Sequence, residues 1–311
     1  MFVALAGGVG AARFLQGLVR VIPSEDVVVV GNTGDDEVFH GLHVSPDLDT
    51  VVYTLAGAVN PETGWGLAGD TFGALDTLAR YGAPTWFRLG DADLATHIHR
   101  TAALRAGASL SEVTADIARA WGLKSRIVPM TDDRVATRIE VEGPAGPVTM
   151  AMQEWFVRER AQPPVRAVRF QGVESARPAP GVLEAVEEAE AIILCPSNPV
   201  ISIGPILALP GLREALAGRR PRVVGVSPII RGAPVKGPAD RLMAALGIEV
   251  SCVGVASAYA DICSTLLVDA QDADRAGELE ELRVKPVVTP ILMGGAEGAE
   301  RLARSVLDNL A

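Results

Sequence analysis

The chain has few cysteines, few aromatic residues and no excess of positive charge, and each shortage excludes a class of proteins. Its three cysteines form no Cys-x-x-Cys pair, so we expect a reducing compartment rather than a disulfide framework. Aromatic residues are 5% of the chain, too few for the stacking platforms that bind single-stranded nucleic acid. The net charge of −10 argues against nonspecific nucleic-acid binding, although it permits one phosphate pocket built of backbone N–H groups.

Long apolar runs are absent as well. No stretch reaches the roughly 18 uncharged apolar residues that a membrane helix requires. The N-terminus lacks a basic region, and Arg13 interrupts its apolar run, so it does not resemble a signal peptide. We therefore expect a cytoplasmic protein with no membrane or nucleic-acid partner. Hydrophobic residues, by contrast, make up 49% of the 311 residues, enough for a substantial core.

Strand and helix patterns alternate at both ends of the sequence. Residues 2–6 are an apolar run that ends in glycines, residues 12–20 have helical spacing, and residues 27–30 are four valines. The same rhythm of helix and buried strand returns later, with strands predicted at 191–195, 222–226, 249–254, 266–269 and 287–292. This alternation predicts an α/β protein with a doubly wound, mostly parallel, Rossmann-like sheet.

The middle of the chain has a different pattern. Helices are predicted at 67–81, 91–106 and 110–121, followed by a hairpin of 135–142 with 148–155. We interpret residues 61–172 as a mixed helical and hairpin insertion that lines the acceptor site. Residues 1–60 and 173–311 would then form the nucleotide-binding core.

The first candidate site is the glycine loop at residues 7–10, directly before the first predicted helix. Glycines such as Gly8 and Gly10 let the backbone approach a phosphate, and the N–H groups around Ala11 point at it from the start of the helix. Arg13 adds a positive charge one turn further on. A tight strand-to-helix turn would give the same letters. The full dinucleotide fingerprint is missing, because Arg13 replaces the third glycine and no acidic residue ends the second strand.

Two acidic segments follow in the first fifty residues. Asn32, Asp35 and Asp36 come directly after the valine strand, and Asp47 and Asp49 surround a leucine after a proline turn. Each segment alone fits a solvated turn or a helix N-cap. Several carboxylates beside a phosphate loop, at strand ends that the fold brings together, point instead to Mg²⁺, which usually takes one or two carboxylates plus phosphate oxygens.

Two later segments have the composition of a ligand site. Trp86 and Arg88 could hold a planar ring and its anionic edge, although core aromatics ahead of a helix cap would look the same. Ser197, Asn198 and Ser202, in a turn braced by prolines after a predicted central strand, offer neutral donors to a phosphate, ribose or base.

Six blocks occur in a fixed order: residues 6–15, 32–36, 45–50, 64–66, 86–91 and 196–203. Together they resemble the 2-phospho-L-lactate transferase family of coenzyme F420 biosynthesis, over about two thirds of the chain. The resemblance implies that a guanosine diphosphate donor carrying phospholactate, or its enolpyruvyl counterpart, transfers its phosphate-linked group to the ribitol hydroxyl of the deazaflavin Fo. GMP would leave, F420-0 or its dehydro form would result, and the enzyme would be a homodimer.

The resemblance also implies roles for individual residues. Asp35 and Asp49 are expected to be catalytic and to bind Mg²⁺, with either as the proton acceptor, and Asp49, Arg88 and Trp86 are expected to contact Fo. We expect Asp49→Asn to leave the fold intact and to remove most turnover. The expected contacts to the nucleotide and its phosphates are Gly8, Gly10, Ala11, Arg13, Asn32, Ser197, Asn198 and Ser202.

Two other classes share part of the pattern. A regulatory branch of the superfamily, which binds a nucleotide or nucleotide sugar without converting it, looks similar at the glycine loop and at the Asp35–Asp36 turn. Residues 46–50 and 86–88 favour the transferase. A Rossmann-like oxidoreductase is disfavoured by the incomplete dinucleotide fingerprint.

Overall fold

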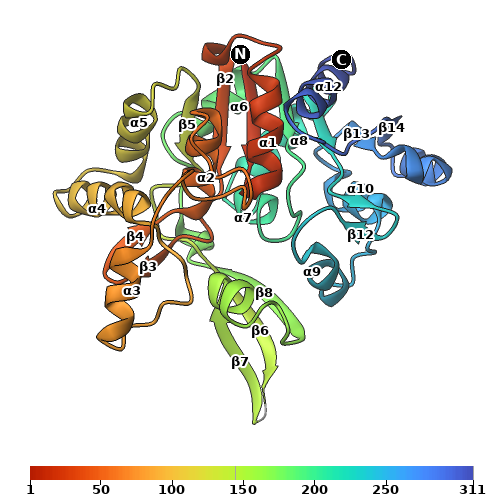
Figure 1. The fold of residues 1–311 in the computed structure, drawn as a ribbon. Coiled ribbons are helices and arrows are strands. Elements are labelled where there is room, and N and C mark those ends of the chain that lie inside the picture. Colours follow the sequence, from red (N-terminus) through yellow and green to blue (C-terminus); the bar gives the residue numbers. More distant parts are fainter. Residues whose placement is uncertain (144, 311) are drawn as a thin grey trace.

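A seven-stranded parallel sheet forms the centre of the computed structural model, which describes residues 1–143 and 145–310 (Figure 1). The strand order is β14-β13-β10-β9-β1-β2-β5. The strands are β1 (Phe2–Ala6), β2 (Val27–Gly31), β5 (Arg126–Pro129), β9 (Ala191–Leu194), β10 (Val223–Val226), β13 (Thr265–Val268) and β14 (Lys285–Val288). The predicted doubly wound α/β fold is confirmed.

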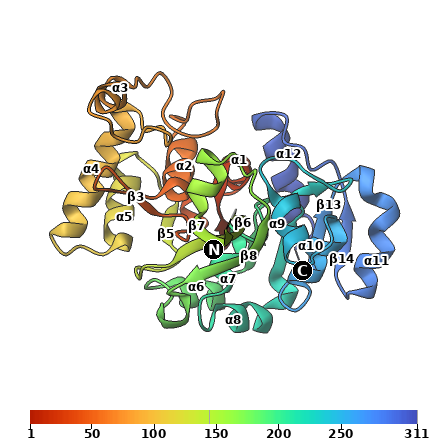
Figure 2. The same ribbon diagram turned by 90° about the horizontal axis from the view of Figure 1, so that it is seen from below.

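Helices cover both faces of this sheet, because successive strand residues point to opposite sides. Ala4 and Val29 pack with α1, α2, α5 and α12, whereas Leu5 and Val30 pack with α6 to α11. Figure 2 shows the two helical layers, with α1, α2 and α12 on one side and α6, α7 and α8 on the other. The four valines of β2 are all buried, as expected for a strand covered on both faces.

The helices of the two layers are α1 (Gly8–Leu18), α2 (Pro46–Leu55), α5 (Leu110–Ala120), α6 (Val182–Glu188), α7 (Ile203–Leu207), α8 (Leu212–Gly218), α9 (Ala239–Ala245), α10 (Cys252–Tyr259), α11 (Ala276–Glu281) and α12 (Ala296–Leu307). Two further helices, α3 (Gly73–Arg80) and α4 (Asp91–Arg105), pack against each other, and α4 also packs against α5 (Figure 1). Short 3-10 or π segments are Ser24–Asp26, Glu154–Arg158, Val173–Ser175, Arg220–Arg222 and Ala270–Arg275.

Smaller sheets lie beyond the carboxyl ends of the central strands. The largest is antiparallel, in the order β7-β6-β8, and its third strand was not predicted from the sequence (Figure 1). Two hairpins, β3–β4 and β11–β12, complete this side. The bounds are β3 (Glu37–Phe39), β4 (Leu42–Val44), β6 (Ala136–Gly143), β7 (Gly146–Ala151), β8 (Val165–Gln171), β11 (Ile229–Ile230) and β12 (Ala233–Pro234).

The structure corrects two predictions. β5 lies within the predicted insertion at 61–172, yet it pairs in parallel with β2, from Val28↔Arg126 to Gly31↔Pro129. The insertion is therefore interrupted by an edge strand of the core. The strand predicted at 249–254 is instead a short loop followed by the start of α10 at Cys252, where the Ser251 hydroxyl caps the helix by accepting a hydrogen bond from the Gly254 N–H at 3.1 Å.

No helix within residues 1–143 and 145–310 combines the length and the apolar character needed to cross a membrane. The expected absence of a membrane partner remains a prediction.

Candidate active site

The chain reverses its direction of travel across the sheet between β1 and β9. β1 is followed by β2 and β5 on one side, whereas β9 is followed by β10, β13 and β14 on the other. At such a switch point the two outgoing loops separate and leave a crevice at the carboxyl ends of the strands. A cavity of about 520 Å³ lies here, lined by the glycine loop after β1 and by the Pro196–Asn198 turn after β9.

Glycines are required in the loop because other loops approach it closely. A Cβ atom on Gly10 would lie 2.4 Å from the carbonyl oxygen of Pro196, and one on Gly7 would lie 2.8 Å from Oδ2 of Asp47. Gly8 has a φ of +73°, which favours glycine. The loop thus brings Asp47 and the β9 turn against the start of α1, while Gly7 to Gly10 line the cavity.

The structure gathers most of the predicted residues around this one cavity. Its lining includes Gly8, Gly10, Asp35, Asp49, Trp86, Arg88, Ser197, Asn198 and Ser202. Three predicted residues do not line it. Ala11 is buried in the core, Asn32 is buried behind Asp47, and Arg13 is exposed on α1. The nucleotide contacts predicted for Ala11 and Asn32 would therefore need a rearrangement of the loop. Asn32 has a structural role instead, because its amide donates a hydrogen bond to Asp47.

Asp35 and Asp47 form the acidic centre of the cavity. Asp35 is 6% exposed, and its Oδ1 has no hydrogen-bond partner among the described residues. Burial, and then the charge of Asp47, raise the pKa of Asp35 well above its ordinary value. Burial raises the pKa of Asp47 to about 6, although Asn32 opposes the shift by donating a hydrogen bond to Oδ2 at 2.9 Å. Two buried carboxylates that repel each other form a site for a proton or a cation.

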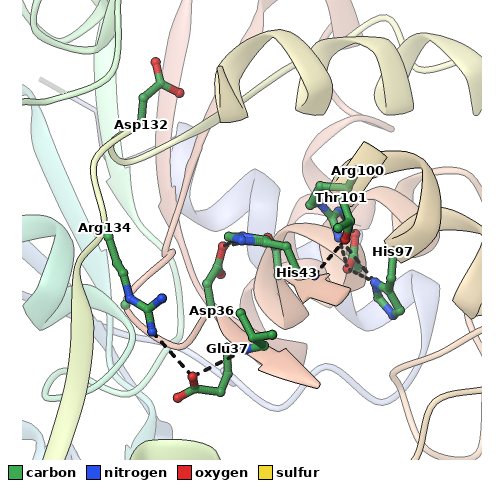
Figure 3. Close-up of polar contacts among 12 residues, drawn as sticks. Asp36, Glu37, His43, His97, Arg100, Thr101, Asp132 and Arg134 are labelled. Atoms are coloured by element: carbon green, nitrogen blue, oxygen red, sulfur yellow. Dashed lines mark hydrogen bonds and ion pairs between the residues drawn. The ribbon is translucent and has the colours of Figure 1, made fainter. Parts of the chain in front are cut away.

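Asp49 also reaches the cavity wall, but its carboxylate already has a cationic partner. Arg100 on α4 donates from Nη1 to Oδ2 at 3.1 Å and from Nη2 to Oδ1, and Arg100 is only 1% exposed. Figure 3 shows Arg100 and His97 side by side on α4. An arginine bound to both oxygens holds the carboxylate in one orientation. The ligand and catalytic roles predicted for Asp49 therefore require it to release part of this contact.

His97 links Asp49 to a second buried acid. Its Nδ1 lies 3.7 Å from Oδ2 of Asp49, and its Nε2 lies 3.3 Å from Oδ2 of Asp93. Tyr53 donates from its hydroxyl to Oδ1 of Asp93 at 2.8 Å. His97 lines the cavity and is 1% exposed. The sequence places His97 and Arg100 one turn apart on a helix. Their contacts with Asp93, on the preceding turn, and with Asp49, on another helix, were not predicted from the sequence.

Asp36 faces away from the cavity, although it follows Asp35 directly. Its Oδ2 lies 2.9 Å from Nε2 of His43 and accepts a hydrogen bond from the Ser45 hydroxyl at 2.6 Å (Figure 3). Burial raises the pKa of Asp36, and the contact with His43 opposes the shift. Asp36 lines a separate cavity of about 220 Å³. The structure therefore divides the two adjacent acids between two locations.

Aromatic side chains form another part of the cavity wall. Phe39 stacks on Phe87 with ring centroids 4.1 Å apart, and Trp86 meets Phe39 edge to face at 5.3 Å. The guanidinium of Arg88 lies 4.0 Å from the centre of the Phe72 ring, which fixes its direction at the cavity. Trp86 and Phe87 both line the cavity, so a flat ring can lie against this wall.

A crevice at the switch point of a parallel sheet, with a glycine loop, a buried acid pair and an aromatic wall, is the site of an α/β enzyme that binds a phosphorylated ligand. Comparison with known proteins narrows this class. The sequence profile of the family described as "2-phospho-L-lactate transferase CofD" matches residues 2–289. The chain belongs to this family and is a transferase of it, which confirms the resemblance found in the sequence.

Curated relatives agree with the family assignment. The chain is 48% identical to a phosphoenolpyruvate transferase of Streptomyces coelicolor, over 98% of this chain and 96% of the relative. It is 46% identical to the enzyme of the same name from Thermobifida fusca and 40% identical to that of Mycolicibacterium smegmatis, in each case over 98% of this chain. The match spans 96% of the Thermobifida fusca enzyme and 97% of the Mycolicibacterium smegmatis enzyme.

The fold also has a counterpart among solved structures. A crystal structure of a Bacillus halodurans protein matches with a TM-score of 0.63 at 16% identity, and it covers 98% of both chains. At this identity the likeness concerns the fold alone.

Proposed function

We propose that the enzyme transfers a phosphoenolpyruvyl or phospholactyl group from a guanosine diphosphate donor to the ribitol hydroxyl of the deazaflavin Fo. GMP is released, and dehydro-F420-0 or F420-0 is formed as a step of coenzyme F420 biosynthesis. The names of the relatives at 40–48% identity favour the enolpyruvyl donor. The single observation that carries the proposal is the buried Asp35–Asp47 pair, in a cavity that the glycine loop and the aromatic residues Trp86 and Phe87 also line.

The chain's own groups have distinct tasks in this reaction. The glycine loop lines the cavity, and its N–H groups can bind phosphate oxygens there, with hydroxyl or amide donors from Ser197, Asn198 and Ser202. The wall of Trp86 and Phe87 orients the deazaflavin ring so that its side chain extends toward the acids. The hydroxyl oxygen forms a bond to the phosphorus that carries the enolpyruvyl or lactyl group, the bond from that phosphorus to GMP breaks, and the hydroxyl proton passes to a carboxylate.

The acid pair also fits the Mg²⁺ that the family resemblance implies. Asp35 and Asp47 repel each other, and Oδ1 of Asp35 has no partner among the described residues. No cluster of three or more histidine, cysteine or acidic ligands exists within the described residues. That agrees with Mg²⁺, which usually takes one or two protein carboxylates and completes its shell with phosphate oxygens and water. When bound, the ion would offset negative charge on the phosphate oxygens.

We therefore assign the cation to Asp35 with Asp47, and to Asp49 the task of positioning. Asp47 replaces Asp49 in the predicted ligand pair because both oxygens of Asp49 accept from Arg100. The predicted contact of Asp49 with Fo is compatible with this assignment, since Asp49 lines the cavity. A homodimer, as implied by the family resemblance, stays a prediction.

The experiment incubates the purified protein with Fo and one of two donors, guanosine diphosphate linked to enolpyruvate or to lactate, in Mg²⁺ or in EDTA. Mass spectrometry should detect GMP and the F420-0 product of the matching donor, in Mg²⁺ only. Asp47→Asn should abolish product. Asp116→Asn, a change at an exposed acid that pairs with Arg119, is the control and should react as the wild type does. Absence of product with both donors would refute the proposed function.

A further inference from the structure

Lys236 is a lysine in the cavity wall to which neither the sequence analysis nor the proposed mechanism assigns a task. It follows the β11–β12 hairpin and lines the main cavity. Its Nζ donates a hydrogen bond to the carbonyl oxygen of Thr63 at 3.0 Å, in the loop between α2 and α3. The lysine therefore crosses the mouth of the cavity, from a loop of the C-terminal half to a loop near the N-terminal acids.

A second cation, Arg13, approaches the same loop from α1. A Cβ atom on Gly64 would lie 3.5 Å from Nη2 of Arg13, so Arg13 and Lys236 border the adjacent residues 63 and 64. Across residues 1–143 and 145–310, no Asp or Glu oxygen lies within 4.0 Å of either cationic group. Partial burial, and then the charge of Arg13, lower the pKa of Lys236.

Holding two like charges near each other without a counter-ion is unfavourable, and an anion placed between them would relieve it. The opposite arrangement exists at the inner end of the cavity, where Asp35 and Asp47 repel each other. The cavity is therefore polarised, with acids in its buried lining and Lys236 at its exposed edge, where Arg13 approaches from outside the lining. A ligand that fits this polarity places an oxyanion at the mouth.

We propose that Lys236, together with Arg13, forms an anion subsite that binds an oxyanion of the donor at the cavity mouth. This inference rests on the proposed function, in which the donor carries a diphosphate and a carboxylate. Both groups present oxygen anions that suit a lysine and an arginine. Because Lys236 donates a hydrogen bond to the Thr63 carbonyl oxygen, an anion bound by this lysine would also lie close to residues 63–64.

The test compares Lys236→Met, which keeps most of the unbranched side chain without its charge, with Lys236→Arg, which keeps the charge. Binding of GDP and of GMP is measured by calorimetry at low and high salt, in addition to KM and kcat with the complete donor. Lys124→Met removes an exposed lysine outside the cavity lining and is the matched control. Thermal unfolding of each variant shows whether the loop contact matters for folding.

If the subsite binds a diphosphate oxygen, Lys236→Met should weaken GDP binding about tenfold or more, because a charge-assisted hydrogen bond is lost. GMP binding should change less, the salt dependence of GDP binding should fall, and Lys236→Arg should restore most of the affinity. If the subsite binds the carboxylate, GDP binding stays unchanged while KM for the complete donor rises about tenfold.

Two results would overturn the inference in separable ways. If the wild type binds GDP and turns over the donor, and the Lys236→Met and Arg13→Met variants match it both in GDP affinity and in KM for the donor, the subsite is removed and the proposed function stands. Wild-type protein that binds neither GDP nor the complete donor removes the proposed function together with the subsite.

Discussion

Asp47 and Asp49 lie two positions apart in the first turn of α2, and replacing each with asparagine should change the free energy of unfolding in opposite directions. Both side chains are buried, with exposures of 9% and 5%, and the chemical change is the same. Asp47 is close to another carboxylate, whereas Asp49 is paired with a guanidinium. Each variant therefore serves as the matched control of the other.

The magnitude for Asp47 follows from its pKa. Burial raises the pKa of Asp47 from 3.8 to about 6 in the folded protein. Folding thus favours the protonated acid, and the stability contributed by this group is present below about pH 4 and is lost as the pH rises through about 6. A difference of about 2 pK units corresponds to about 3 kcal/mol. Asparagine imitates the neutral acid, so Asp47→Asn should equal wild type near pH 4 and exceed it by up to about 3 kcal/mol near pH 7.5.

The magnitude for Asp49 follows from its partner. Asp49→Asn leaves Arg100, which is 1% exposed, without a counter-charge. Removing one member of a buried ion pair typically lowers stability by about 3–5 kcal/mol. At about 2.1 cal/mol/K of unfolding entropy per residue, a chain of 311 residues should lose roughly 5–8 °C in Tm. The geometry thus revises the expectation, drawn from the sequence, that Asp49→Asn leaves the fold intact.

Urea unfolding followed by circular dichroism, in EDTA at about pH 4.5 and pH 7.5, measures both effects. Asp47→Asn should gain stability relative to wild type at the higher pH only, and Asp49→Asn should lose stability there. A result in which both variants are destabilised by similar amounts near pH 7.5 would show that Asp47 does not carry an unfavourable buried charge. The interpretation of the acid pair would then fail.

Three further predictions concern the same cavity. Millimolar Mg²⁺ should raise the Tm of wild type near pH 7.5 but not that of Asp47→Asn, because binding to the folded state alone stabilises it; equal shifts in differential scanning fluorimetry would contradict the assignment. Gly10→Ala should weaken GDP binding at least tenfold and lower Tm, since the new Cβ would lie 2.4 Å from the Pro196 carbonyl oxygen; calorimetry of a correctly folded variant with unchanged affinity would disprove it. Trp86→Ala should raise KM for Fo about tenfold and leave KM for the donor within about twofold, and steady-state kinetics with each substrate varied in turn would show the opposite if the wall bound the nucleotide.

Local patterns were sufficient to predict the architecture and to predict which loops gather around one cavity. The valines of β2 and the apolar run of β9 could be identified as buried strands because they are covered on both faces. Loops at the ends of parallel strands meet at one edge, so the glycine loop, Asp35 and Ser197 were predicted to lie together, and all of them line one cavity.

Pairings between distant segments were not predictable in the same way. Arg100 belongs to an unremarkable helix, 51 positions from the acid that it binds, and no local signal identifies its partner. β5 has only a short apolar centre, Ile127 and Val128, and becomes a strand because β2 offers it an edge. Residues 249–254 have strand-like composition, yet the Ser251 cap and the buried face of α10 determine the outcome.

The position of β1 in the sheet has a consequence for how the protein forms as it leaves the ribosome. One neighbour of β1 is β2, which begins at Val27, and the other is β9, which begins only at Ala191. The second edge of β1 therefore stays unpaired until β9 has been synthesised. Until then the nascent chain carries an unprotected apolar strand edge at its future centre. Slow elongation or a truncated transcript should therefore lead to aggregation of the N-terminal half, and assembly of the transferase crevice between β1 and β9 must be a late event.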